Sequence, residues 1–182
     1  FGDEKEASKI ARNIIKARKI KRISTVSELV KIIEKSKKKN YNKKINICTK
    51  TFQALRIFVN KETTELIEGI IQATKLIKEG GKIIIISFHS IEDKIVKFYF
   101  SNFSQDRSKS SRYLPEKTDN DFIFFENYKN KFLQPTKEEI LENPPSRSAK
   151  LRFVTRNKKK FDYPEDFKIK FKKYLDLERT HV

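Results

Sequence analysis

The chain has 182 residues, of which 42 are Lys or Arg and 24 are Asp or Glu, and its formal net charge is +18. A hydrophobic content of 37% with 15 phenylalanines excludes general disorder, and the length holds one ordinary domain, or a small domain with part of another. The charge favours a polyanion partner such as RNA, although an excess of Lys with abundant Ile, Asn and Phe is also typical of drift in an AT-rich genome.

The cysteine count and the hydropathy pattern limit the compartment and the kinds of site that the chain can have. Cys48 is the single cysteine, which excludes an intramolecular disulfide and, with only His89 and His181 to assist it, gives no metal-ligand cluster. No apolar segment approaches the roughly 18 residues that span a bilayer, and charges interrupt every apolar run near the N-terminus. We therefore expect a cytoplasmic protein with no metal site and no membrane partner.

The first 36 residues predict two amphipathic helices. Apolar residues recur at helical spacing between Asp3 and Ala17, and Thr25 with Glu28 has the spacing of a capping box. Residues 36–44 form a basic loop, either a solvated linker or a phosphate contact. Because the sequence begins at Phe1 inside what looks like an element and contains no Met, we expect a fragment of a longer protein.

Residues 51–60 predict a third helix. Gln53, Arg56 and Asn60 stand at i, i+3 and i+7, so they share one helix face. That face could bond RNA or a neighbouring loop, or it could simply be solvated.

The centre of the chain predicts a helix–strand–helix unit. An amphipathic helix over residues 62–78 leads through Gly80 into an isoleucine run over 82–87, which is typical of a central strand buried on both faces of a parallel sheet. Ser90 and Asp93 have capping-box spacing for the next helix. The unit is half of a doubly wound α/β fold, in which ligands bind outside the carboxyl ends of strands. Phe88, His89 and Ser90 lie there.

The later elements are shorter. Residues 105–120 read as a surface loop, 122–125 (FIFF) as a buried strand, and 136–143 as a short helix opened by Thr136 and Glu139. Residues 150–156 alternate like a strand, so the two late strands predict an antiparallel edge on a mainly parallel sheet. The tail from Asn157 is basic, with a predicted helix after Pro164.

The spacing of residues alone indicates few candidates for a catalytic or anion-binding site. His89 beside Ser90 suits acid–base work, although a histidine at a strand end is as often a structural hydrogen-bonder. Arg147 lies between serines after two prolines and could hold a phosphate or carboxylate, or remain an exposed surface arginine. Four glycines cannot make a glycine-rich phosphate loop.

Four blocks add a resemblance. FGDEKEASKIARNIIKAR, TFQALRIFVN, GGKIIIISFHSIEDKIVK and NPPSRSAKLR, in this order, resemble the ribosomal RNA small subunit methyltransferase H family over residues 1–156. The resemblance implies the carboxyl-terminal half of a Rossmann-like class I methyltransferase sheet (46–156), preceded by the end of an inserted helical subdomain (1–45). The basic tail (157–182) exceeds the family pattern.

The resemblance also implies a reaction and a site. The reaction is N4-methylation of a cytidine in the decoding centre of 16S rRNA, with S-adenosylmethionine as donor. His89 and Ser90 would position the base, Phe88 would stack on it, and RNA would be bound by Gln53, Arg56, Asn60, Arg147 and Ser148. The partner implied is 16S rRNA within the small ribosomal subunit. Whether the chain also pairs with a second copy of itself, as a homodimer, is left open.

The sequence departs from the family in one major respect. The family's amino-terminal half, with its glycine-rich cofactor loop, is absent, so cofactor-binding residues are expected outside this chain and the chain alone is expected to be inactive. Asn46-Ile47 also replaces a His-Pro pair, and Pro145 replaces an arginine. A non-catalytic basic RNA-binding module is therefore the alternative function.

Overall fold

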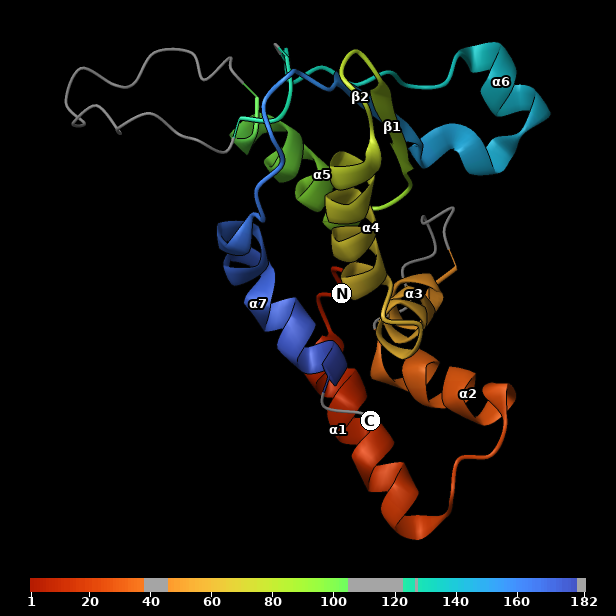
Figure 1. Cartoon of the computed structure of the whole chain (residues 1–182). Coiled ribbons are helices and arrows are strands. Elements are labelled where there is room, and N and C mark those ends of the chain that lie inside the picture. The colour runs from red at the N-terminus through yellow and green to blue at the C-terminus, as the bar shows by residue number, and fades with distance from the viewer. Residues whose placement is uncertain (38–45, 105–122, 127, 180–182) are drawn as a thin grey trace, which may run out of the picture. The chain divides into compact units, whose positions relative to one another are not determined.

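The computed structural model describes residues 1–37, 46–104, 123–126 and 128–179 as a mixed α/β chain (Figure 1). These residues form two compact units, Phe1–Glu62 and Thr63–Val182. The predicted boundary at residues 45/46 lies within the first unit and inside a stretch, 38–45, that is outside the described residues. Among the described helices, none has the length and apolarity needed to cross a membrane.

The first unit is helical, as its amphipathic patterns predict. It contains α1 (Ala7–Ile20), α2 (Val26–Ser36) and α3 (Thr49–Val59). Its core gathers around three buried residues, Ile10, Ile33 and Cys48, with Ile14, Leu29 and Phe52 packed against them. Burial raises the pKa of the Cys48 thiol, which keeps it protonated.

The predicted capping box at the start of α2 is confirmed. Thr25 Oγ1 accepts the Glu28 amide at 3.2 Å, and the Glu28 carboxylate accepts the amides of Ser24 and Thr25 at 2.8 and 3.1 Å. Lys21 Nζ adds an ion pair at 3.0 Å. The Ser24 amide, followed by Lys21 and the Thr25 amide, lowers the pKa of Glu28 to about 2.

This low pKa predicts an acid-sensitive helix start. A depressed carboxyl pKa stabilises the fold above the unfolded pKa of about 4.3 and ceases to do so as pH falls towards 2. We expect wild type to lose more thermal stability than Glu28→Gln when pH falls from about 5 to about 2, measured by far-UV circular dichroism. Glu34→Gln, on the exposed face of the same helix, is the control and should behave as wild type does. An equal pH response of wild type and Glu28→Gln would contradict this assignment.

The second unit contains a two-stranded antiparallel sheet. Strand β1 (Lys82–Ser87) pairs with β2 (Lys150–Thr155), from Lys82 opposite Thr155 to Ser87 opposite Lys150. Helices α4 (Glu62–Leu76) and α5 (Ser90–Asn102) flank β1 in the sequence, and α5 packs on both strands. The predicted 150–156 strand and its antiparallel pairing are confirmed, but its partner is the isoleucine strand.

The prediction that β1 is buried on both faces is wrong for the described residues. Ile83 and Ser87 are buried on the side of Val154 and Arg152, whereas Ile84 and Ile86 are 59% and 52% exposed. The sheet has one covered face because α5 packs on one side of it. The other face remains apolar and open, since Ile84 is paired with the exposed Phe153.

The prediction of a strand over residues 122–125 (FIFF) is also wrong. Phe124 and Phe125 are fully buried, but Phe125 forms only isolated bridges, to Ser104 and to Arg156. Phe122 and the loop predicted over 105–120 lie outside the described residues. A short apolar aromatic run predicts burial well, but it cannot distinguish a strand from an irregular segment that fills a core.

The remaining elements agree with their local signals. Thr136 Oγ1 accepts the Glu139 amide at 3.2 Å and opens α6 (Lys137–Glu142). A 3-10 turn, η1 (Pro144–Ser148), follows and leads into β2. Helix α7 (Glu165–Arg179) starts just after Pro164. Four of its side chains are buried in the second unit: Phe167, Phe171, Leu175 and Glu178.

Candidate functional site

The predicted site begins where β1 ends. Ser87 is buried at the last strand position, and Phe88, the next residue, is 55% exposed. His89 is the N-cap of α5 and accepts the Glu92 amide through Nδ1 at 3.4 Å. The predicted cap pair, Ser90 and Asp93, is therefore wrong by one residue, because His89 and Glu92 have the same three-residue spacing and form the capping box.

His89 faces Glu92 with both ring nitrogens. Its Nε2 lies 3.1 Å from Glu92 Oε1, but the geometry is not that of an aligned hydrogen bond. Nε2 is consequently a buried polar atom that lacks a hydrogen-bond partner among the described residues. Such an atom has hydrogen-bonding capacity left for a substrate group, which would compete with the nearby Glu92 carboxylate for it.

Glu92 fills the amino terminus of α5. Its Oε2 accepts the amide of Phe88 at 2.8 Å and that of His89 at 3.4 Å. Burial would raise the pKa of Glu92, but the His89 side chain and the Phe88 amide outweigh burial and lower it. The helix terminus is thus already occupied by a carboxylate, so an anionic substrate would have to compete with Glu92 there.

A buried ion cluster lies beneath this turn, and sequence reasoning missed it. Arg152 is only 3% exposed; its Nε donates to Asp93 Oδ1 and its guanidinium to the Tyr128 hydroxyl, both at 2.7 Å. Lys150 Nζ reaches the other Asp93 oxygen at 3.0 Å. Burial would raise the pKa of Asp93, but the hydrogen bonds from Arg152 and Lys150 hold it below its ordinary value.

The cluster joins α5 to β2, so it fixes how the His89 turn sits on the sheet. One signal for it was available in the sequence. In the alternating 150–156 segment, Arg152 and Arg156 share a face with Val154, and arginine on a strand face that packs against a helix needs a partner.

Arg147 and Ser148 lie at the same end of the sheet as Phe88. Because Ser87 is opposite Lys150, the segment that leaves β1 and the η1 turn that enters β2 emerge together. Arg147 is exposed, and among the described residues its guanidinium donates to the Pro144 carbonyl at 3.1 Å. The register supports the expected proximity of the two segments, which stays a prediction.

The α3 face is differently arranged. Arg56 makes a two-point contact with Glu62, at 2.8 and 3.0 Å, and Asn60 donates to the same carboxylate at 3.2 Å. Gln53 is half-buried on the same helix. Two of the three predicted RNA-contacting side chains are therefore engaged within the protein, and an RNA phosphate would have to exchange with Glu62.

The segments described above fall within the match to a single family model. The model of the MraW methylase family matches residues 1–157, which include α3, the His89 turn and β2. This chain belongs to the MraW methylase family. The match ends near the close of β2, so helix α7 of this MraW family member lies beyond the matched residues.

Individual relatives agree with that assignment. The chain is 46% identical over 154 residues to the ribosomal RNA small subunit methyltransferase H of Ehrlichia chaffeensis, which covers 85% of this chain and 48% of the relative. It is 40% identical over 156 residues to the protein of that name from Bartonella bacilliformis, covering 86% and 46%. The chain thus spans about half the length of these relatives.

Proposed function

We propose that this chain supplies the base-binding part of an rRNA cytosine-N4 methyltransferase that acts on the decoding centre of 16S rRNA with S-adenosylmethionine as methyl donor. The observation that carries the proposal is the family match over residues 1–157, supported by relatives named as ribosomal RNA methyltransferases. In the proposed assembly this chain provides the later half of a Rossmann-like sheet. The open apolar face of Ile84, Ile86 and Phe153 supports this, because such a face calls for a covering element.

The proposed roles follow from the geometry after β1. Phe88 is exposed and can stack on the target cytosine. The buried Nε2 of His89 makes no aligned hydrogen bond among the described residues, so it can bond the base edge, with Ser90 beside it. Arg147 and Ser148, at the same end of the sheet, suit a neighbouring phosphate. Gln53, Arg56 and Asn60 would contact RNA elsewhere. Methyl transfer mainly requires such positioning, together with a polar partner for the amine proton.

The methyl donor supplies the electrophilic methyl group when it is bound. Its usual glycine-rich loop is missing from this sequence, which has four glycines in all. We therefore assign none of these residues to the donor, and we propose that the donor site lies in the half of the relatives that this chain does not match.

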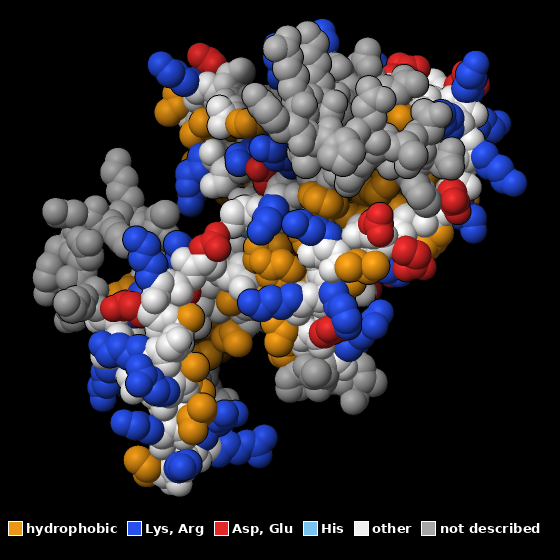
Figure 2. Space-filling view, turned by 90° about the vertical axis from the view of Figure 1, so that its left-hand side faces the viewer, with side chains coloured by type: hydrophobic (Ala, Val, Ile, Leu, Met, Phe, Trp, Pro, Cys, Tyr) orange, Lys and Arg blue, Asp and Glu red, His pale blue; other side chains and the backbone are white. Residues whose placement is uncertain are grey.

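A basic RNA-binding module is the second candidate function. The net charge of +18 favours it, and Figure 2 shows Lys and Arg side chains spread over the visible face rather than gathered in one patch. A spread of this kind suits salt-sensitive, sequence-independent phosphate binding. It does not require the His89 turn, which makes the two functions separable by mutation.

The test is a fused enzyme, the amino-terminal half of the Ehrlichia chaffeensis relative joined to this chain, assayed for labelled-methyl transfer to small ribosomal subunits. We expect His89→Ala to lower the transfer rate about 100-fold, the effect of losing a group that positions the base. His89→Asn should retain the helix cap, which is worth about 1 kcal/mol, and still lose transfer. Arg147→Ala should lower transfer about fivefold, the effect of one phosphate contact at about 0.1 M salt.

Arg179→Ala, an exposed arginine on α7, is the matched control and should leave transfer unchanged. Nucleoside mass spectrometry identifies the modified base. If His89→Asn restores both stability and transfer, His89 is a structural cap and its assignment to the site fails. If the wild-type fusion binds RNA without transferring a methyl group, the binding-module function is favoured.

A further inference from the structure

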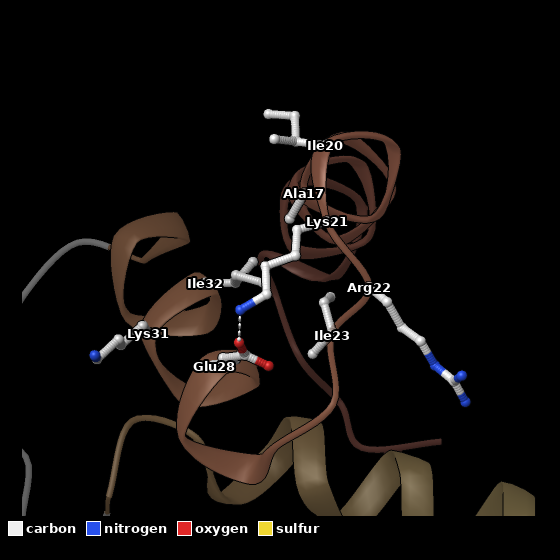
Figure 3. Close-up of a pocket in the computed structure, with 8 residues that line it drawn as sticks. All are labelled: Ala17, Ile20, Lys21, Arg22, Ile23, Glu28, Lys31 and Ile32. Atoms are coloured by element: carbon white, nitrogen blue, oxygen red, sulfur yellow. Dashed lines mark hydrogen bonds and ion pairs between the residues drawn. The ribbon is translucent and has the colours of Figure 1, made fainter.

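An open groove lies at the tip of the α1–α2 hairpin, within the first unit. It has a volume of about 280 Å³ and is lined by the end of α1, the connecting turn and the first turns of α2 (Figure 3). Four apolar residues contribute to its lining, Ala17, Ile20, Ile23 and Ile32. The groove does not belong to the site around His89.

The groove has a basic rim. Its polar lining consists of three basic residues, Lys21, Arg22 and Lys31, and one acidic residue, Glu28. Glu28 is committed to the capping box and to Lys21, which reaches it across the groove at 3.0 Å. Arg22 and Lys31 point away from Glu28 (Figure 3), and neither has a hydrogen bond or ion pair within the described part of the chain.

An apolar floor with a basic rim matches a nucleotide. Phosphate is attracted by Arg and Lys, while a base exposes apolar faces that can lie on isoleucine side chains. Ile20 is 89% exposed at the edge of the groove, so its side chain is accessible to a base.

We infer that this groove is a second RNA-binding site, which takes an unpaired nucleotide with its base on the isoleucine floor and its phosphate on Arg22 or Lys31. The inference rests on the proposed RNA substrate. Because a base within a duplex is stacked and cannot reach the floor, the groove binds single-stranded RNA in preference to a duplex of the same sequence.

The experiment uses the full 182-residue chain and fluorescence anisotropy with a labelled single-stranded RNA oligonucleotide. We expect Arg22→Gln to weaken binding about fivefold at about 0.1 M salt, and to reduce the slope of log affinity against log salt by about 0.7, the effect of one lost phosphate contact. Ile20→Ser should weaken binding about threefold, the ratio expected when roughly 25 Å² of apolar contact is lost. It should leave binding of an abasic strand of the same length unchanged.

Lys9→Gln is the matched control, since Lys9 is exposed on the same helix but does not line the groove, and it should change affinity less than twofold. If Arg22→Gln behaves as Lys9→Gln does, the groove inference is overturned while general RNA binding stands. If Arg22→Gln weakens binding of an acidic peptide but not of RNA, the groove is a peptide site and the inference is again overturned. If wild type binds no RNA, the groove inference is overturned, while the proposed function still depends on the fused enzyme. If the groove variants behave as expected but the fused enzyme transfers no methyl group, only the proposed function fails.

Discussion

Replacing Phe171 with alanine is expected to lower the free energy of unfolding of the second unit by about 3–5 kcal/mol, the usual cost of deleting a buried aromatic ring. Phe171 is 2% exposed on α7. Its ring lies 5.5 Å from that of Phe98 on α5 and 5.6 Å from that of Phe167, both edge-on. The cavity would thus open inside an aromatic cluster. Urea denaturation of the full chain, followed by circular dichroism, measures the loss.

Ile169→Ala provides the control on the same helix. Ile169 is exposed, so its replacement should change the free energy of unfolding by less than about 0.5 kcal/mol. If Phe171→Ala is as mild as Ile169→Ala, helix α7 does not pack on the unit as described, and the tail is an accessory segment.

The tail matters because it lies beyond the residues that the family model matches. Helix α7 nevertheless contributes to the core, and its last turn caps another helix. The buried Glu178 carboxylate accepts the amides of Thr63 and Thr64 at 3.2 and 2.9 Å, at the start of α4. A carboxylate at a helix amino terminus satisfies donors that otherwise have no intrahelical partner. Residues beyond the family match therefore stabilise the matched fold.

Sequence reasoning located the helices well because their signals are local. The Thr25–Glu28 and Thr136–Glu139 caps formed as predicted, since a cap depends on side chains and amides within one turn. At the start of α5 two pairs had the right spacing. We predicted the cap from Ser90 and Asp93, but Asp93 bonds Arg152, 59 residues away, and His89 caps the helix with Glu92.

Strand environments were harder to predict because they depend on partners distant in the sequence. The isoleucine run of β1 correctly predicted a strand, but an apolar run does not indicate which face of the strand is covered. In β2 the alternation was visible, yet it did not show that the arginine-bearing face turns inward. That choice depends on Asp93 and Tyr128, which the folded chain brings to Arg152.

Asp93→Ala is the second large effect expected, with a loss of about 3–5 kcal/mol in the free energy of unfolding. The change leaves the Arg152 guanidinium buried without its carboxylate, and an uncompensated buried charge costs more than the ion pair contributes. Combining Asp93→Leu with Arg152→Met removes both charges at similar volume and should cost markedly less than Asp93→Ala alone. Asp176→Ala, which breaks the exposed Lys172 pair, is the control and should cost less than about 1 kcal/mol.

The Asp93–Arg152 pair also makes stability depend on pH, which distinguishes the loss of its charge from the loss of its packing. Because the folded-state pKa of Asp93 is held below its ordinary value, its contribution is complete above the unfolded pKa of about 3.9 and disappears as pH falls through the lower folded-state pKa. The stability difference between wild type and Asp93→Ala should therefore be constant from about pH 7 to pH 5 and shrink in stronger acid. Urea denaturation of both proteins, from neutral pH into strong acid, measures this difference. A difference that persists undiminished in acid would show that Asp93 acts by packing, and that the ion cluster does not hold α5 against β2.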